Sequence, residues 1–128
     1  AQEVSEYIES QSSNEDLKAY LEPLSASLER LSDVTEYVIK TAKTDINVVG
    51  AASVEYLDLF GLTAQAYLWA RMVAVAAPKA GNAEDDFYSA KLKTPAFFFS
   101  KVLPRTLSLA ECIRAGAEVT MGLNEAQF

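Results

Sequence analysis

The chain has 128 residues, of which 50% are hydrophobic and 23% are charged, with five Gly and four Pro. This composition predicts one folded domain and excludes an intrinsically disordered chain. The net charge of −7 argues against a protein that binds nucleic acid or an anionic membrane surface, because both need clustered Lys and Arg.

A short helix is expected within residues 1–12, where Val4, Tyr7 and Ile8 share one face. Residues 14–43 predict a long amphipathic helix with Ser13 or Asn14 as its N-cap. Pro23 falls between core positions, so we expect a kink there and not a stop. The apolar seam of this helix consists of two seven-residue series, Leu17, Leu24, Leu31 and Val38, and Leu21, Leu28, Thr35 and Ala42.

Residues 46–77 predict a second helix that is apolar on more than one face. Ala66, Ala70 and Ala74 lie four residues apart, so a neighbouring helix can approach closely along this ridge and the helix should be the centre of a bundle. The most apolar window, residues 57–77, contains Asp58, Gln65 and Arg71, which are costly in hydrocarbon. We therefore expect a helix of a soluble protein and no membrane span.

Arg71 stands in the most apolar part of this second helix, between Ala70 and Met72. A buried arginine requires a carboxylate partner, because an unpaired buried charge costs several kcal/mol. If the helices are antiparallel, Asp16, Glu22 and Asp86 are the candidates for this structural ion pair. The alternative is that Arg71 anchors the phosphate or carboxylate of a ligand.

A turn at residues 78–82 precedes the acidic segment 84–86, which suits the start of a helix. The third helix should cover residues 85–115 and end at Gly116, a typical residue after a helix C-terminus. Pro95 puts the straightness of this helix in question. Its core stripe is expected to contain Tyr88, Leu92, Phe99, Leu103, Thr106, Leu109 or Ala110, and Ile113.

Phe97 is expected outside the core stripe of the third helix. Successive helical residues point about 100° apart, so Phe97, Phe98 and Phe99 cannot all lie on one face. Phe99 belongs to the core stripe and Phe98 flanks it, which leaves Phe97 beside Lys93 and Lys101. We expect these three residues to form a docking surface for another domain or subunit, unless residues 1–12 cover Phe97.

Residues that carry common catalytic or metal chemistry are scarce. The chain has no histidine and one cysteine, and its five glycines form no phosphate-binding loop. We therefore expect no catalytic, cofactor-binding or metal site within these residues. Cys112 is interpreted as a small buried apolar side chain, with a reactive thiol as the alternative.

Several segments together carry a resemblance to a known family: GAASVEYL at 50–57, FG at 60–61, AYLWARM at 66–72, FYSAKL at 87–92, FFF at 97–99, LPR at 103–105, AGA at 115–117 and the terminal Phe128. In their order and spacing they resemble the extra C-terminal helical domain of bacterial acyl-CoA dehydrogenases similar to 3-methylmercaptopropionyl-CoA dehydrogenase. The resemblance covers residues 48–128 well and residues 1–47 loosely.

The resemblance implies that the chain is one C-terminal domain, residues 1–128, of a longer cytoplasmic flavoenzyme. In that family FAD accepts a hydride from the acyl β carbon while a glutamate removes the α proton, but neither the flavin site nor the base can be assigned to a residue here. The domain would contact the catalytic domains of its own chain, and a homo-oligomer is left open. The alternatives are a free-standing helical interaction module and a carrier of an apolar small molecule. The expected fold is an all-α antiparallel bundle of three long helices with a short N-terminal helix.

Overall fold

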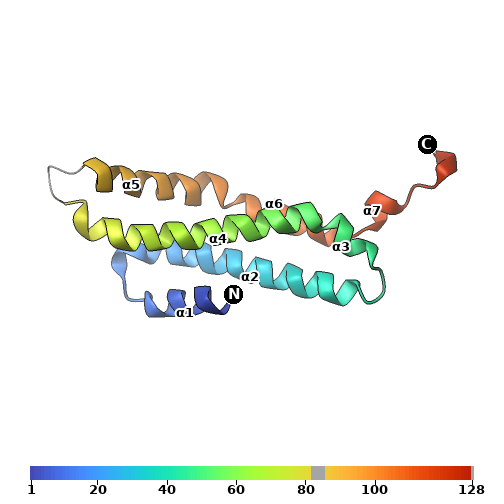
Figure 1. Cartoon of the computed structure of the whole chain (residues 1–128), viewed down its shortest axis with the longest axis horizontal. Helices are drawn as coiled ribbons and strands as arrows, with labels where there is room; N and C mark the ends of the chain where they lie inside the picture. Colours follow the sequence, from blue (N-terminus) through green and yellow to red (C-terminus); the bar gives the residue numbers. More distant parts are fainter. Residues whose placement is uncertain (82–85, 128) are drawn as a thin grey trace.

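The computed structural model describes residues 1–81 and 86–127. Three rods of helix run antiparallel, and the short helix α1 lies along one side of them (Figure 1). The first rod is α2, the second is α3 with α4, and the third is α5 with α6. Their bounds are α1 Gln2–Ser10, a 3-10 turn Glu15–Leu17, α2 Lys18–Thr41, α3 Asn47–Ala51, α4 Ser53–Ala76, a 3-10 turn Ala77–Lys79, α5 Asp86–Phe97, a π-helical turn Phe98–Val102, α6 Arg105–Arg114, α7 Glu118–Met121 and a 3-10 turn Glu125–Gln127.

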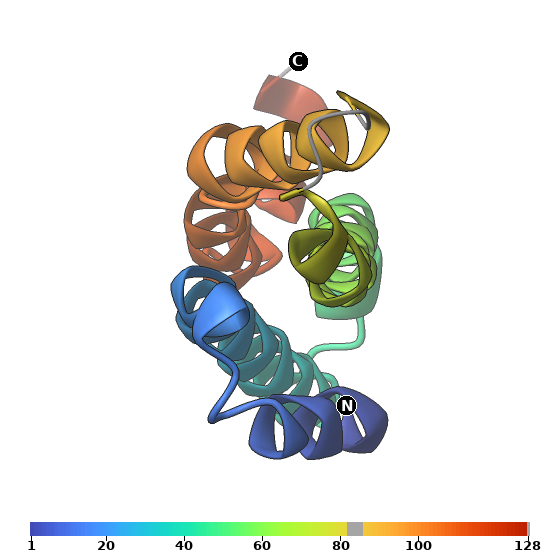
Figure 2. The ribbon, with the colours of Figure 1, turned by 90° about the vertical axis from the view of Figure 1, so that its left-hand side faces the viewer.

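This arrangement confirms the predicted all-α antiparallel bundle of three long helices and a short N-terminal helix. No strand occurs in the two described stretches, 1–81 and 86–127. Helix α4 packs against both other rods, because α2, α5 and α6 all contact it (Figure 2). The predicted packing of the second helix against both other rods is therefore confirmed, but one side of it is exposed, so it is not enclosed at the centre of the bundle.

Helix α2 buries the first half of its predicted seam and shifts away from it in the second half. Asn14 caps the preceding turn by accepting a hydrogen bond from the Asp16 amide at 3.1 Å. The burial then moves to Ser27 and Val34, both 0% exposed, whereas Leu31 is only partly buried. In a straight α-helix, residues seven positions apart are rotated by about 20° around the helix axis. The side of α2 that faces the core therefore moves off the seven-residue seam along the helix. The fully or nearly buried seam residues are Leu17, Leu21, Leu24 and Leu28.

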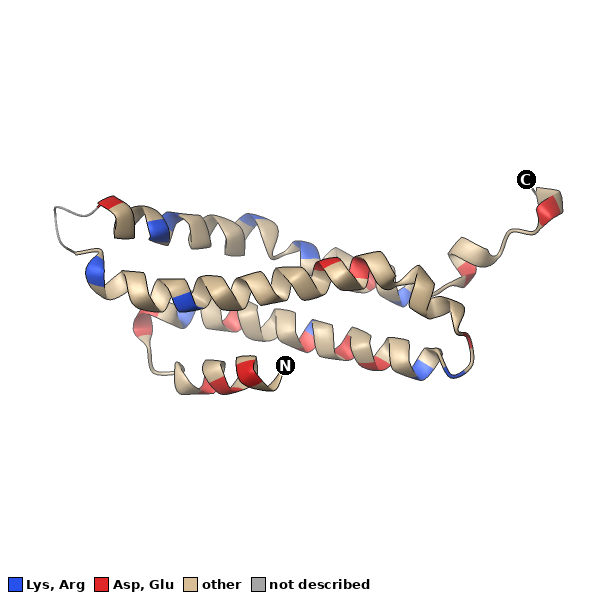
Figure 3. Ribbon diagram, viewed as in Figure 1, with Lys and Arg blue, Asp and Glu red and all other residues tan. Residues whose placement is uncertain are grey.

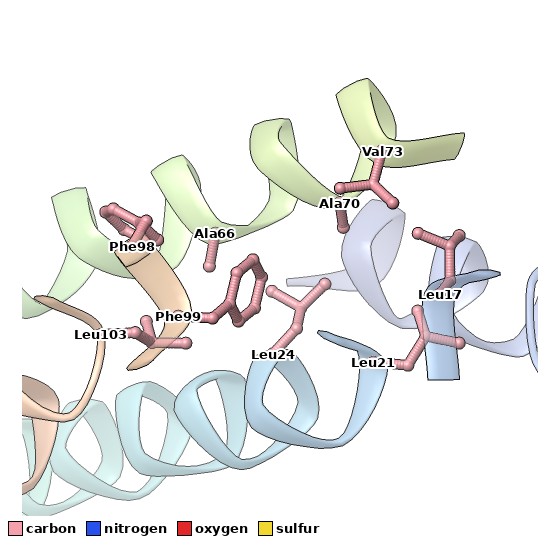
Figure 4. Packing of buried hydrophobic residues seen from close by; sticks show 9 residues of the cluster. All are labelled: Leu17, Leu21, Leu24, Ala66, Ala70, Val73, Phe98, Phe99 and Leu103. Atoms are coloured by element: carbon pink, nitrogen blue, oxygen red, sulfur yellow. The ribbon is translucent and has the colours of Figure 1, made fainter. Parts of the chain in front are cut away.

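The core has two hydrophobic clusters along the length of α4. The first lies where α2 and the π-helical turn meet the second half of α4, and Figure 4 shows its side chains pointing toward one another: Leu17, Leu21, Leu24, Ala66, Ala70, Val73, Phe98, Phe99 and Leu103. The second cluster contains Val34, Ala52, Leu59, Ala110 and Ile113. Ala66 and Ala70 are fully buried, so the predicted alanine ridge is confirmed at these two positions. The N-terminal helix packs on the first cluster through Val4, Tyr7 and Ile8, also as predicted.

One buried polar pair lies between α2 and α4. The Thr63 hydroxyl donates to the Leu59 carbonyl at 2.9 Å, and its oxygen lies 2.7 Å from Ser27 Oγ. Since Thr63 has only one hydroxyl proton, Ser27 must be the donor in the contact between the two side chains. Both hydroxyls are thus satisfied inside the core, which fixes the register of α2 against α4 at this level.

The expected continuous helix over residues 46–77 is interrupted between α3 and α4. Ser53 Oγ donates to the Gly50 carbonyl at 2.8 Å, and Ala52 has a ψ of −8°. A serine hydroxyl that occupies a main-chain carbonyl competes with the helical hydrogen bonds, so a break at this point has a local cause. The prediction of one unbroken second helix was wrong here.

The expected continuous helix over residues 85–115 is also broken, at Pro104 and not at Pro95. Pro95 is buried within α5, and the helix continues through it. At the break, the Leu103 amide donates to the Phe98 carbonyl at 2.9 Å, a bond to the fifth residue back that defines the π-helical turn. Pro104 has no amide proton to continue the hydrogen-bond ladder, and α6 begins at the next residue, Arg105.

Gly116 ends α6 as predicted. Its φ of +78° is a left-handed conformation that side chains rarely adopt, and a Cβ there would lie 3.4 Å from the Tyr37 hydroxyl. Beyond it, α7 and the residues that follow it up to 127 project away from the rods (Figure 1).

Candidate docking surfaces

The described residues contain no assembly of side chains that could hold a metal ion. No group of three or more His, Cys, Asp or Glu residues converges within residues 1–81 and 86–127. Cys112 is exposed, so its interpretation as a buried apolar side chain was wrong. Its neighbour Ile113 takes the core position of α6 instead. Residues 84 and 85 of the acidic segment lie outside the described residues, and Asp86 begins α5.

Phe97 lies on the surface at the end of α5. Its side chain is 61% exposed, whereas Phe98 and Phe99 are 6% and 8% exposed. The following π-helical turn directs both buried rings into the core, where they meet edge to face with centroids 5.9 Å apart. Lys93 and Lys101, on either side of Phe97, are exposed as well. Residues 1–12 do not cover Phe97, because α1 packs against α2 and the first core cluster.

The surface around Phe97 belongs to the basic side of an otherwise acidic chain. The described stretch from residue 86 to residue 105 carries four cations, Lys91, Lys93, Lys101 and Arg105, and one acidic residue, Asp86. Residues 2–41 carry nine acidic residues and three cations. Figure 3 shows the resulting separation, with blue along the third rod and red on α1 and α2. An exposed aromatic ring among cations is suited to contact an acidic, partly apolar protein surface.

Arg71 does not form the predicted ion pair with Asp16, Glu22 or Asp86. Within the described stretches, the ion pairs join Lys18 to Glu15 and Arg114 to Asp33 and Glu111. The Arg71 guanidinium lies 5.5 Å from the centre of the Tyr67 ring, and its side chain is exposed. The reason is helical phase: Ala70 and Val73 occupy the buried side of α4, and residue 71 points away from it.

Tyr67 connects α1 to α4. Its hydroxyl donates to Glu3 Oε1 at 2.8 Å, and its ring meets that of Tyr7 edge to face with centroids 5.3 Å apart. The Glu3 hydrogen bond and then desolvation raise the pKa of Tyr67 above its ordinary value of 10.0, against the opposing charge of Arg71. Burial is the main cause that raises the pKa of Tyr7, whose hydroxyl is buried without a hydrogen-bond partner in the described part of the chain.

These tyrosines predict a loss of stability at alkaline pH. A folded-state pKa above the unfolded value means that the folded chain holds its protons longer, so stability is intact below pH 10.0 and falls as pH rises through the folded pKa. Thermal unfolding measured at increasing pH should show this loss. Glu3→Gln should make it shallower, because it removes the carboxylate charge beside the Tyr67 hydroxyl that raises the pKa of Tyr67. Glu9→Gln on the same helix is the control, and an equal slope in both variants would contradict the assignment.

The second exposed surface is the side of α4 that faces away from the core. Its large side chains are Val54, Leu57, Leu68, Met72 and Val75, which are between 40% and 69% exposed. A groove of about 560 Å³ lies between this side and the start of α5, lined by Leu68, Arg71, Met72, Val75, Ala76, Phe87, Tyr88 and Lys91. A second groove of about 490 Å³ lies toward α2 at the other end of the helix, with Ile39, Val49 and Phe60 among its lining residues. Sequence reasoning recognised that this helix was apolar on several faces but assigned no surface to it.

The same segment, Ser53–Lys79, is long and apolar enough to cross a membrane by length and composition. A third of its most apolar 18-residue window is buried inside the structure. The core helix of a water-soluble protein meets the same criterion, and the absence of a membrane span stays a prediction based on Asp58, Gln65 and Arg71.

Three antiparallel rods of helix with two exposed apolar surfaces define the chain as a helical-bundle domain. Residues 1–124 match the family described as acetyl-CoA dehydrogenase C-terminal like, and the chain belongs to this family. It is thus a C-terminal helical domain of the acyl-CoA dehydrogenase type, which confirms the resemblance to such a domain, and the match also includes the N-terminal region. A search of curated proteins found no match.

Proposed function

We propose that this chain is a non-catalytic C-terminal domain of an FAD-dependent acyl-CoA dehydrogenase that docks on the catalytic domains of its own chain through Phe97, Lys93 and Lys101. The parent enzyme, on this proposal, is cytoplasmic, resembles 3-methylmercaptopropionyl-CoA dehydrogenase and oxidises acyl-CoA to 2-enoyl-CoA. Family membership supports the link to the enzyme. The single observation that carries the docking surface is the 61% exposed ring of Phe97 in the basic part of the chain.

The chemistry of the surface suits a contact within an enzyme better than a ligand site. A large aromatic side chain contributes binding energy when a partner surrounds it and excludes water. The neighbouring lysines contribute orientation and selectivity toward an acidic surface, and their effect weakens as salt is added. On this proposal the domain stabilises the packing of the parent chain, contacts another subunit or shapes the substrate entrance. FAD is held by the catalytic domains and not by this domain.

Hydrogen–deuterium exchange tests the docking. Backbone amides of residues 93–101 should exchange more slowly in the parent chain than in the 128-residue chain, because contact with the catalytic domains suppresses local opening. In the parent chain, Phe97→Ser should abolish this protection and leave the helical circular dichroism unchanged. Leu107→Ser, which changes another exposed apolar residue at 53% exposure, is the matched control.

Two results would contradict the proposal. Equal exchange at residues 93–101 in both chains would remove the docking surface while leaving the family assignment intact. A reading frame without flavoenzyme sequence upstream of Ala1 would favour the free-standing interaction module instead. In the 128-residue chain alone, a flavin absorption spectrum after purification would show that the cofactor is held here and not in the catalytic domains.

A further inference from the structure

The outward side of α4 has a regular apolar pattern along the whole helix. We define the outer α4 face as Val54, Leu57, Gly61, Ala64, Leu68, Met72 and Val75, which recur every three or four residues. The buried residues Leu59, Ala66 and Val73 lie on the opposite side, against α2 and the third rod. Figure 2 shows α4 at the edge of the bundle, so that one side of the helix is turned away from α2 and α6. A helix that is apolar on all sides is normally covered on all sides.

The middle of the outer α4 face is made of small residues. Gly61 and Ala64 lie near the centre, and a Cβ added at Gly61 would meet no atom within 4 Å. Leu57 lies on the N-terminal side of this centre, and Leu68 lies on the C-terminal side. A second helix can therefore approach closely in the middle while large side chains interlock at both ends.

The pattern is symmetric about the midpoint of α4. The helix covers Ser53–Ala76, so its midpoint lies between residues 64 and 65. An antiparallel second copy related by a two-fold axis at this midpoint places Val54 level with Val75 of the second copy. The same axis places Leu57 level with Met72 of the second copy and Gly61 level with Leu68 of the second copy. A face that matches itself under a two-fold axis is the requirement for a symmetric homodimer.

The charges at the edge of this face follow the same symmetry. Asp58 and Trp69 are eleven residues apart, about three helical turns, and therefore lie on the same flank of α4. This flank faces the third rod, because the centres of the Trp69 and Phe98 rings are 6.4 Å apart. Lys91 projects from that rod into the groove beside Met72. In the antiparallel pair each flank meets the same flank of the second copy, so Asp58 lies opposite Lys91 of that copy. Within residues 1–81 and 86–127 neither has an oppositely charged partner.

We propose that the outer α4 face is the contact between two copies of this chain, packed antiparallel about the midpoint of α4 and bordered by two Asp58–Lys91 pairs. The inference uses only α4 and α5 and does not depend on the proposed function. A protein partner fits better than a lipid bilayer, because Asp58 and Arg71 at the edges of the face would be costly in hydrocarbon. A second copy supplies the matching apolar residues and an opposite charge on the flank that contains Asp58.

Sedimentation velocity of the 128-residue chain tests the proposal. A dimer of twice the 14.0 kDa monomer mass is expected at micromolar concentration. Leu68→Asp should leave a folded monomer, because its side chain is already 50% exposed and the core is untouched. Asp58→Lys or Lys91→Glu alone should raise the dimer dissociation constant about tenfold through repulsion at two symmetric sites. The double variant Asp58→Lys/Lys91→Glu should restore it, whereas Lys101→Glu should have little effect.

Site-directed cross-linking provides an independent measurement. In a Cys112→Ser background, Ala64→Cys lies beside the two-fold axis and should form a covalent dimer on oxidation, whereas Glu29→Cys on α2 should not. A chain that stays monomeric at all concentrations would overturn the proposal. So would a dimer that keeps its affinity in Leu68→Asp, or a monomer that binds phosphatidylcholine vesicles and loses this binding in Leu68→Asp.

Discussion

Phe99→Ala is expected to lower the free energy of unfolding by about 3–5 kcal/mol, the usual cost of removing a buried aromatic side chain. The ring is 8% exposed and meets Tyr20 edge to face with centroids 4.9 Å apart. It lies in the first core cluster among residues from α2 and α4, so truncation leaves a cavity between all three rods. Urea denaturation followed by circular dichroism gives the measurement.

Phe97→Ala is the matched control for this substitution, because the same ring two residues earlier is 61% exposed. A change within about 0.5 kcal/mol is expected for an exposed position. Equal losses in the two variants would show that Phe97 is part of the core and would also remove the proposed docking surface.

Leu59→Ala should cost about 2–5 kcal/mol, the range for a fully buried leucine. Leu59 is 0% exposed and holds the second cluster together with Val34 of α2 and Ile113 of α6. Leu107→Ala on α6 is the control, since Leu107 is 53% exposed and alanine is at least as good a helix former. A loss below about 1 kcal/mol in Leu59→Ala would mean that this residue does not pack α4 against α2 and α6.

The arrangement of the rods could be predicted from local periodicity, but their interruptions could not be placed. The long apolar stripes of residues 14–43, 46–77 and 85–115 each correspond to one rod. The break before Ser53 coincides with the hydrogen bond from its hydroxyl to the Gly50 carbonyl, and the break at Pro104 follows the π-helical turn. Pro95 and Pro104 lack the same amide proton, yet α5 continues through Pro95 and only Pro104 lies at a break, so the residue type alone does not place the interruption.

Arg71 shows why the candidate ion pair could not be predicted. The apolar neighbours of this residue suggested burial, but an apolar neighbour along the chain says nothing about which side of a helix faces the core. In the structure, Arg71 lies over Tyr67 and forms no ion pair with a carboxylate among the described residues. Phe97 is different, because three successive aromatic residues cannot share one helical face and one of them had to be outside it.

The sequence by itself determined the helical class, the three antiparallel rods, the family and the position of Phe97 outside the core. These depend on periodicity, short connections and residue order, which are properties of the chain alone. Only the tertiary structure decided which side of α4 is buried. One side packs against α2 and the third rod, and the other side is uncovered, although the helix is apolar on both. The physical reason is that burial depends on which elements pack together, and a helix without a polar side carries no local signal of which side its neighbours will cover.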